Sequence, residues 1–332
     1  MARSRISGIF AVLLLLSLLF APLANAQATR LSIATGGTGG VYFPYGGALA
    51  NLLSSELEDT EVTAEVTSAS VDNMYLIESQ DADIAFVLGD TAWDATQANE
   101  PFENEINGVA LAALYDNFTQ IVVRGDAGIA SVADLAGMRV SVGSPGSGTE
   151  VIANRMLEVS GIDPESGIEV ERLGVAESAD AIRDGNIDAF FWSGGLPTAA
   201  ITDLGATPNL EISILPHGEL AEPLGEAYGD FYNTATIPAE TYPGQTEDVE
   251  VVVVPNVLVV NGEMDEELAY NILRVMFDGQ AELAAAHPAA NELSLEYATQ
   301  NSPIPFHPGA IRYFEEQGVT PGGTPEATPE EG

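Results

Sequence analysis

The stretch 34-ATGGTGGVYFPYGG-47 stands between two patterned segments. A short apolar segment, residues 31–34, runs into it, and a helical pattern, residues 48–53, leaves it. A strand, a glycine-rich loop and a helix in this order direct backbone N–H groups and a helix N-terminus at an anion. Taken alone, the stretch is equally consistent with a flexible turn.

The same arrangement returns 107 residues later, at 143-GSPGSGT-149, between a predicted strand and a predicted helix over 151–159. The segment 79-SQDADIAF-86 is likewise echoed by 183-RDGNIDAF-190. Two features that repeat at nearly one offset indicate two lobes built on one plan. Strands alternate with helices throughout, which predicts an α/β fold with mostly parallel sheets. Each lobe is expected to point a helix N-terminus into a shared cleft.

The N-terminus is typical of a secretory signal peptide over residues 1–26. Two arginines precede an apolar run from Ile9 to Leu23, and Ala24-Asn25-Ala26 supplies a cleavage site. The alternative, a membrane anchor, needs about 20 apolar residues. The chain has no cysteine, so it offers neither a lipid-attachment site nor disulfides. We therefore expect a periplasmic or otherwise extracytoplasmic protein without stable membrane insertion.

The charge is strongly one-sided, with 50 acidic residues against 10 arginines, no lysine and a formal net charge of −40. Such a surface repels nucleic acids and anionic membranes. Acidic residues spread along the whole chain favour adaptation to high external salt, where charges are screened within about 3 Å at 1 M. An ordinary acidic secreted protein is the alternative.

Three segments together resemble the signature segments of the TAXI family, the extracytoplasmic solute receptors of TRAP transporters. They are 34-ATGGTGGVY-42, 143-GSPGSGT-149 and 189-AFFWSGG-195. The resemblance covers residues 30–317 and implies a periplasmic binding protein-like fold, with two α/β lobes and two crossing strands as hinge. It also implies a small carboxylate ligand, of the glutamate, glutamine or 2-oxoglutarate type, and a TRAP partner with a small and a large membrane subunit.

Carried over by motif, the resemblance implies a ligand site with residues from both lobes. The implied ligand-binding residues are Thr38, Gly39, Val41, Tyr42, Ser68, Ser144, Gly146, Ser147, Gly148, Thr149, Trp192, Ser193 and Gly194. One departure concerns 67-TSASVDN-73, where many relatives read Thr-Gly-Gly-Ser-x-x-Asn. Ser68 and Ala69 replace two glycines there, which leaves the ligand contacts of this loop open.

The predicted organisation places lobe 1 at residues 27–121 and 255–318, and lobe 2 at residues 122–254. The hinge is expected near residues 120–123 and 251–255, and residues 319–332 are expected to form a disordered acidic tail. Residues 233–248 are expected to be a loop, and a helix is expected over 46–57.

For several side chains the sequence is consistent with two roles. Tyr42 could bind the ligand or fill the core, and its place inside the loop favours the ligand. Trp192 could stack on the ligand or cap the sheet. Arg124 and Arg155 could neutralise a second carboxylate, but surface ion pairs are the favoured interpretation among so many acids.

Other chemistry has little support in the sequence. There is no P-loop and no Gly-x-Ser-x-Gly elbow. His217, His287 and His307 lack metal-ligand spacing. We therefore predict no catalytic residue, no metal and no cofactor. Two rival hypotheses remain: an exported lyase or dehydratase of a small acid on the same fold, and a receptor that feeds a membrane sensor.

Overall fold

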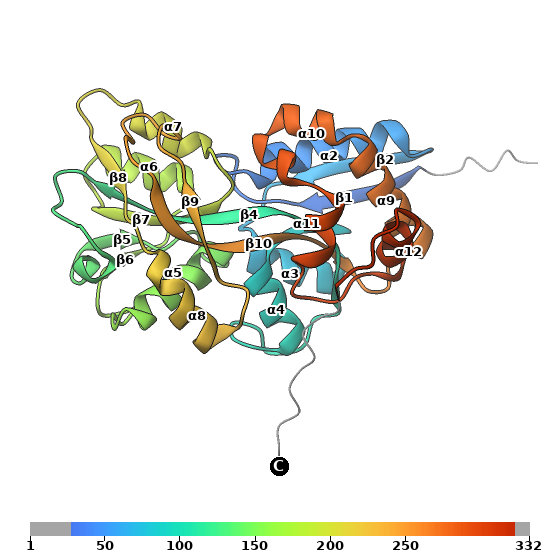
Figure 1. Cartoon of the computed structure of the whole chain (residues 1–332), viewed down its shortest axis with the longest axis horizontal. Coiled ribbons are helices and arrows are strands. Elements are labelled where there is room, and N and C mark those ends of the chain that lie inside the picture. The colour runs from blue at the N-terminus through green and yellow to red at the C-terminus, as the bar shows by residue number, and fades with distance from the viewer. Residues whose placement is uncertain (1–27, 323–332) are drawn as a thin grey trace, which may run out of the picture.

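The computed structural model describes residues 28–322. The predicted signal peptide and most of the predicted tail lie outside this range. One sheet of ten strands runs through two lobes, in the order β2-β1-β3-β10-β4-β7-β5-β6, with β8 and β9 at its side (Figure 1). The sheet is mixed, because its central strands β10 and β4 run antiparallel to their neighbours.

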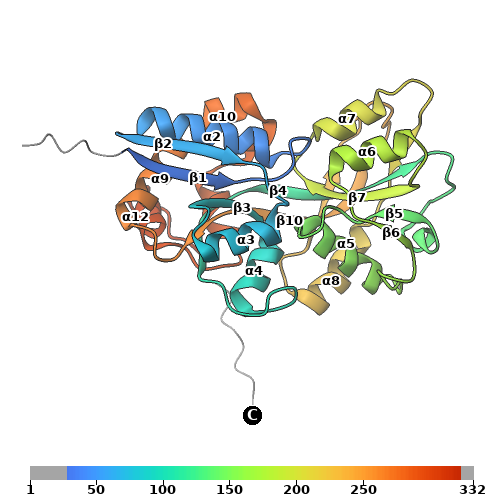
Figure 2. The same ribbon diagram turned by 180° about the vertical axis from the view of Figure 1, so that it is seen from behind.

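Lobe 1 is built on three parallel strands. These are β1 (Thr29–Ala34), β2 (Thr60–Glu65) and β3 (Ile84–Leu88). Helices α2 (Tyr42–Glu56) and α10 (Gln280–Ala286) cover one face, and α3 (Ser70–Ser79) and α4 (Gly89–Gln97) cover the other (Figures 1 and 2). Because helices lie on both faces, all five residues of β3 are buried and apolar. The lobe is completed by α9 (Glu266–Asp278), η4 (Pro288–Glu292), α11 (Leu295–Gln300) and α12 (Pro308–Glu316).

Lobe 2 repeats this plan. Its parallel strands are β5 (Arg139–Ser141), β6 (Glu169–Glu171) and β7 (Ala189–Gly194). Helices α6 (Val175–Arg183) and α7 (Ala199–Gly205) lie on one side, and α5 (Gly148–Val159) and α8 (Ala221–Tyr228) on the other (Figure 2). The remaining elements are η2 (Val132–Leu135), β8 (Ile212–Ile214), η3 (Gly218–Leu220) and β9 (Asn233–Ile237). The internal repeat that the sequence predicts is therefore confirmed.

Two long strands join the lobes: β4 (Gly108–Arg124) and β10 (Val249–Asn261). Residues 110–115 and 257–260 of these strands pack in the core of lobe 1. Residues 121–123 and 251–254 pack in the two clusters of lobe 2. The crossing therefore lies at residues 116–120 and 255–256. This architecture confirms the predicted fold class, while the boundaries at 121/122 and 254/255 remain predictions.

Two local predictions were wrong. Helix α2 begins at Tyr42 rather than Gly46, because a proline is tolerated in the first turn. Residues 233–237 form strand β9 along β10 rather than a loop. A membrane-spanning helix, judged by length and apolar character, is not found within residues 28–322.

Candidate functional site

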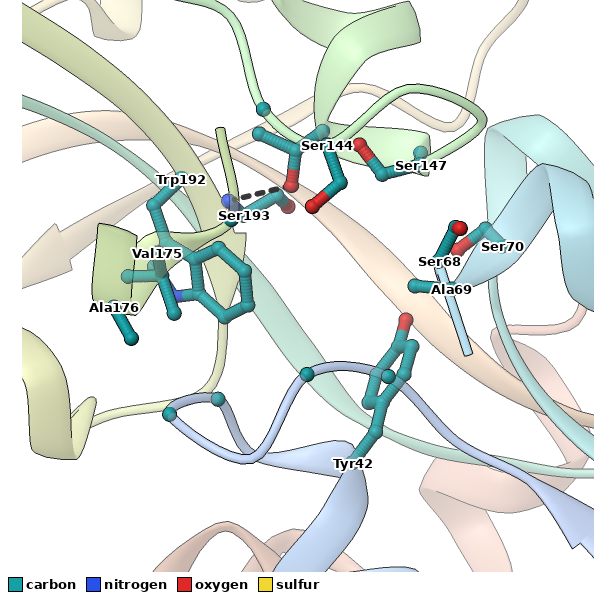
Figure 3. A pocket seen from close by; sticks show the side chains of 18 of the residues that line it. Tyr42, Ser68, Ala69, Ser70, Ser144, Ser147, Val175, Ala176, Trp192 and Ser193 are labelled. Carbon is teal, nitrogen blue, oxygen red and sulfur yellow. Dashed lines mark hydrogen bonds between the residues drawn. The ribbon is translucent and has the colours of Figure 1, made fainter. Parts of the chain in front are cut away.

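A cavity of about 250 Å³ lies between the lobes. Lobe 1 contributes the loops after β1 and β2 and the end of β3, and lobe 2 contributes the loops after β5 and β6 and the end of β7. In Figure 3, Tyr42, Ser68 and Ser70 face Ser144, Ser147 and Ser193 across the cavity. Pockets for drug-sized ligands measure roughly 300–1,000 Å³, so this cavity suits a smaller molecule.

Most of the predicted site residues line this cavity. They are Thr38, Gly39, Val41, Tyr42, Ser68, Ser144, Ser147, Gly148, Thr149, Trp192 and Ser193. Gly146 and Gly194 do not line it. A Cβ at Gly194 would lie 2.6 Å from the indole nitrogen of Trp192, so this glycine makes room for the ring behind the wall.

The sequence reasoning missed the segment 173–177, which follows β6 and lines the cavity. The internal repeat could have indicated this segment, because Gly174 follows Thr67 by 107 residues, the same offset that relates Gly143 to Gly36. Leu88, Ser70 and Gly143 were also missed; Ser70 and Gly143 lie close to predicted site residues, whereas Leu88 ends the buried strand β3.

Four helices begin at the cavity: α2 at Tyr42, α3 at Ser70, α5 at Gly148 and α6 at Val175. The first N–H groups of a helix have no partner within it, and each helix N-terminus carries about half a positive charge. Within residues 28–322, the N–H groups of Gly148 and Thr149 have no protein acceptor. Two helices from each lobe thus direct partial positive charge at one small volume.

The cavity wall is rich in hydroxyl groups and, among the described residues, includes no arginine or histidine. Every arginine in residues 30–312 pairs with a carboxylate instead. Glu177 contributes the one carboxylate of the wall, at an exposed position. The arrangement therefore offers neutral hydrogen-bond donors and helix N-termini to a ligand, rather than a cationic side chain.

In the loop before α5, the N–H groups of residues 146–149 are not all available to a ligand. The Gly146 N–H donates to the Glu150 carboxylate at 2.9 Å, and Arg172 pairs with the same carboxylate at 2.7 Å. The Ser147 Oγ accepts from the N–H of Glu150 at 3.1 Å and so caps the helix. Of the N–H groups of residues 146–149, those of Gly148 and Thr149 stay free for a ligand.

Tyr42 lies at the first position of α2, not in the preceding loop. Its hydroxyl accepts a hydrogen bond from Asn256 Nδ2 on β10 at 2.6 Å. Burial raises the pKa of Tyr42, although hydrogen bonds to Ser70 and Asn256 lower it. The phenol is therefore neutral, and because its oxygen already accepts from Asn256, its proton is available for an acceptor near the cavity.

The lobes meet around the cavity through glycines. A Cβ at Gly40 would lie 2.7 Å from the Trp192 ring, and a Cβ at Gly148 would lie 2.6 Å from Leu88. The N–H of Asp72 in lobe 1 also donates to the carbonyl of Gly146 in lobe 2 at 3.1 Å. Trp192 itself donates from Nε1 to Thr198 at 2.9 Å. Because glycine has no side chain, the two lobes can approach each other closely around the cavity.

The loop 67–70 contains Ser68 and Ala69, which replace the two glycines of the family pattern. Ala69 has φ 81° and ψ −143°, a conformation that glycine adopts readily and alanine does not. Asn73 holds the loop in place, because its Nδ2 donates to the carbonyls of Thr35 and Phe86, both at 2.8 Å. The asparagine of the pattern is thus structural, while Ser68 and Ser70 face the cavity.

The interpretation of Arg155 as a surface ion pair was wrong, because Arg155 is buried between the lobes. Its Nη2 lies 2.7 Å from Asp94 of α4, and Nη1 donates to the Tyr232 hydroxyl at 2.9 Å. Tyr232 donates in turn to Asp90 at 2.9 Å. Burial raises the pKa of Asp94 to about 6 despite the opposing effect of Arg155. Arg124, by contrast, makes the expected partly exposed pair with Asp126.

The three histidines have structural roles. His287 and His307 cap helical segments through Nδ1. His217 is buried, accepts from the Val252 N–H at Nδ1 and lies 3.1 Å from the Thr119 carbonyl at Nε2. Burial lowers the pKa of His217 to about 4. No cluster of three or more His, Asp or Glu side chains suited to a metal occurs in the part of the chain that the structure describes.

The two lobes, the crossing strands and the cavity between them define the fold of periplasmic binding proteins. The chain belongs to the NMT1-like family, whose family model matches residues 33–318.

Solved structures with a similar fold include two sulphonate-binding proteins. The periplasmic aliphatic sulphonate binding protein SsuA from Escherichia coli is 16% identical over 88% of this chain and 79% of its own, with a TM-score of 0.48. SsuA from Xanthomonas axonopodis pv. citri, bound to MOPS, is 16% identical over 89% and 82%, with a TM-score of 0.47. An ancestral arginine-binding protein is 14% identical over 82% and 99%, with a TM-score of 0.47. At these values the likeness carries no argument about the ligand.

Proposed function

We propose that this protein is an extracytoplasmic solute-binding receptor that captures a small carboxylate between its lobes and delivers it to a TRAP-type transporter. The observation that carries the proposal is the convergence of four helix N-termini on one hydroxyl-lined cavity. Helix N-termini favour anions through their free N–H groups and dipoles. A carboxylate needs no cationic side chain in such a site.

The three segments that resemble the TAXI family support the transporter type, since each contributes to the cavity wall. The signal peptide predicted over residues 1–26 supports a location outside the cytoplasmic membrane. The partner would be the small and large membrane subunits of the transporter, and the ligand types that the resemblance implies are glutamate, glutamine and 2-oxoglutarate.

The rival hypothesis of an exported enzyme needs a general acid or base in the cavity. Tyr42 and Glu177 are the titratable side chains of the wall, and burial raises the pKa of Tyr42 away from neutrality. A sensor role would leave the binding site unchanged and differ only in the membrane partner.

A thermal-shift screen of the mature protein in high salt tests the proposal against amino acids, dicarboxylates and 2-oxoacids. A ligand at 100 times its dissociation constant stabilises the folded state by about 2.7 kcal/mol. We expect a large shift with at least one carboxylate, without chemical turnover. The shift should shrink in Ser144→Ala, which removes a cavity hydroxyl, and persist in Ser213→Ala on the exposed edge of lobe 2. Turnover of the carboxylate, or no shift with any of them, would contradict the proposal.

A further inference from the structure

The two crossing strands carry buried polar side chains where they pass between the lobes. The segments that pack in the lobe cores, 110–115, 121–123, 251–254 and 257–260, are apolar except for the Tyr115 hydroxyl, but β4 carries Asn117 and Thr119 at the crossing, and β10 carries Asn256. All three side chains are at most 1% exposed. Valine or isoleucine occupies the buried positions that follow in lobe 2. Packing alone therefore gives no reason for polar residues at the crossing.

These side chains have unused hydrogen-bonding capacity. Within the described chain, both carboxamide atoms of Asn117, the Thr119 hydroxyl and the Asn256 Oδ1 are buried without a partner. The same holds for the hydroxyl of Ser193 on β7. A buried polar group without a partner costs free energy, which makes such groups rare unless they have a role. We refer to Asn117, Thr119, Ser193 and Asn256 as the polar row.

Of the polar row, Ser193 lines the cavity, and Asn117, Thr119 and Asn256 lie behind the lining residues. Thr119 and Ser193 are opposite each other in the β4–β7 register, so their side chains share one face of the sheet. Asn117, two residues from Thr119, points to the same face. Ser193 lines the cavity, and Asn256 donates to the hydroxyl of Tyr42, which also lines it. The row thus extends over the adjacent strands β7, β4 and β10. It runs from Ser193, which lines the cavity, to Asn256, which is hydrogen-bonded to the cavity residue Tyr42.

We propose that the polar row is the floor of the ligand site and binds a neutral hydrogen-bonding group of the ligand, namely a hydroxyl, carbonyl or carboxamide. This inference rests on the proposed function, in which the helix N-termini hold the carboxylate. The unused atoms include donors, on Asn117, Thr119 and Ser193, and acceptors, on Asn117 and Asn256. The row contains no carboxylate, so the partner for an ammonium group would be Glu177 of the cavity wall rather than the row. The nearby carboxylate of Asp90 is already bonded to Tyr232 and Thr91.

Calorimetric titration tests the inference with four- and five-carbon dicarboxylates that differ only at C2. The set comprises the unsubstituted, 2-hydroxy, 2-oxo and 2-amino compounds. We expect the wild-type protein to bind a 2-hydroxy or 2-oxo compound at least ten-fold more tightly than the unsubstituted compound of the same length. In Asn117→Leu this preference over the unsubstituted compound should fall below three-fold.

Leucine is close in shape to asparagine, so Asn117→Leu should fold, and its melting temperature in the absence of ligand should rise. Thr119→Val gives a second variant of matched shape, and Asn233→Leu on the exposed strand β9 is the control that should keep the wild-type preference. A preference that survives in both row variants, or one that is absent from the wild type while dicarboxylates bind, would overturn this inference alone. If no dicarboxylate binds the wild-type protein, this inference fails, while the proposed function fails only if no other small carboxylate gives a thermal shift either.

Discussion

The guanidinium of Arg155 in lobe 2 lies 2.7 Å from the carboxylate of Asp94 in lobe 1, and the side chains are 9% and 2% exposed. Tyr232 extends the contact to Asp90, and the ring of Tyr228 lies under the guanidinium at 4.5 Å. Arg155 is on the same helix, α5, whose first turn lines the cavity. The helix α5 therefore connects the cavity wall to the buried ion pair between the lobes.

Replacing Arg155 by methionine should destabilise the protein strongly, because Asp90 and Asp94 would remain buried without a cation. Removal of one partner from a buried pair typically costs about 3–5 kcal/mol. Urea unfolding monitored by circular dichroism measures the difference. The matched control is Arg274→Met, since Arg274 makes a more exposed i,i+4 pair with Asp278 and should cost at most about 0.5 kcal/mol. Equal losses in the two variants would contradict the inter-lobe role of Arg155.

Gly148→Ala should weaken ligand binding without unfolding the protein. The added Cβ would lie 2.6 Å from Leu88 and 2.9 Å from the Ser70 hydroxyl, both in lobe 1, so it opposes closure. We expect at least a ten-fold loss of affinity, equivalent to about 1.4 kcal/mol, for the carboxylate that gives the largest thermal shift. Gly47→Ala is the control, because nothing lies within 4 Å of its Cβ. Unchanged affinity in Gly148→Ala would show that closure does not need this contact.

Ala69→Gly should stabilise the protein, against the usual effect of glycine. The φ of 81° at this position strains an alanine by about 1–3 kcal/mol, which exceeds the roughly 0.5–1 kcal/mol of chain entropy that glycine loses on folding. Chemical denaturation should show a net gain of about 1 kcal/mol. The same substitution at Ala48, inside α2, should instead cost about 1 kcal/mol. A loss at Ala69 would mean that its backbone is not strained.

His217 should make stability fall in mild acid. Its folded pKa of about 4 lies below the unfolded value of 6.5, so protonation favours the unfolded chain. The contribution is complete above pH 6.5 and declines as the pH falls to about 4, with a total of about 3 kcal/mol. Thermal unfolding between pH 4 and 7.5 measures it, and His217→Gln should show a shallower loss than the wild type. Parallel curves for both proteins would exclude His217 as the cause.

The sequence was sufficient to predict the fold because its repeat and its loops are local patterns. Strand, glycine-rich loop and helix recur at one offset, and each glycine-rich loop falls at the carboxyl end of a parallel strand, where ligands bind in such sheets. The start of α2 was misplaced because Pro44, Gly46 and Gly47 resemble a loop. Gly46 lies in the helix for a tertiary reason: a Cβ there would lie 2.5 Å from the side chain of Thr35, which directly follows β1.

The parts of the site that sequence could not predict depend on long-range pairing. Arg155 and Asp94 are 61 residues apart, and no spacing rule indicates that α4 and α5 meet at the lobe boundary. Asn117 and Asn256 look like interruptions in apolar strands until the strand register brings them together behind the cavity wall. Ser147 was implied as a ligand contact, and its hydroxyl also caps α5; a sequence does not distinguish these two uses of one hydroxyl.

The most direct measurement is a calorimetric titration of the mature protein with the best carboxylate from the screen and with its primary amide. The amide keeps the shape of the acid and removes its charge, so the comparison isolates the contribution of the helix N-termini. We predict that the carboxylate binds at least ten-fold more tightly than the amide, in a one-to-one complex. Equal affinity for both compounds, or binding of neither, would contradict the account of the cavity as a carboxylate site.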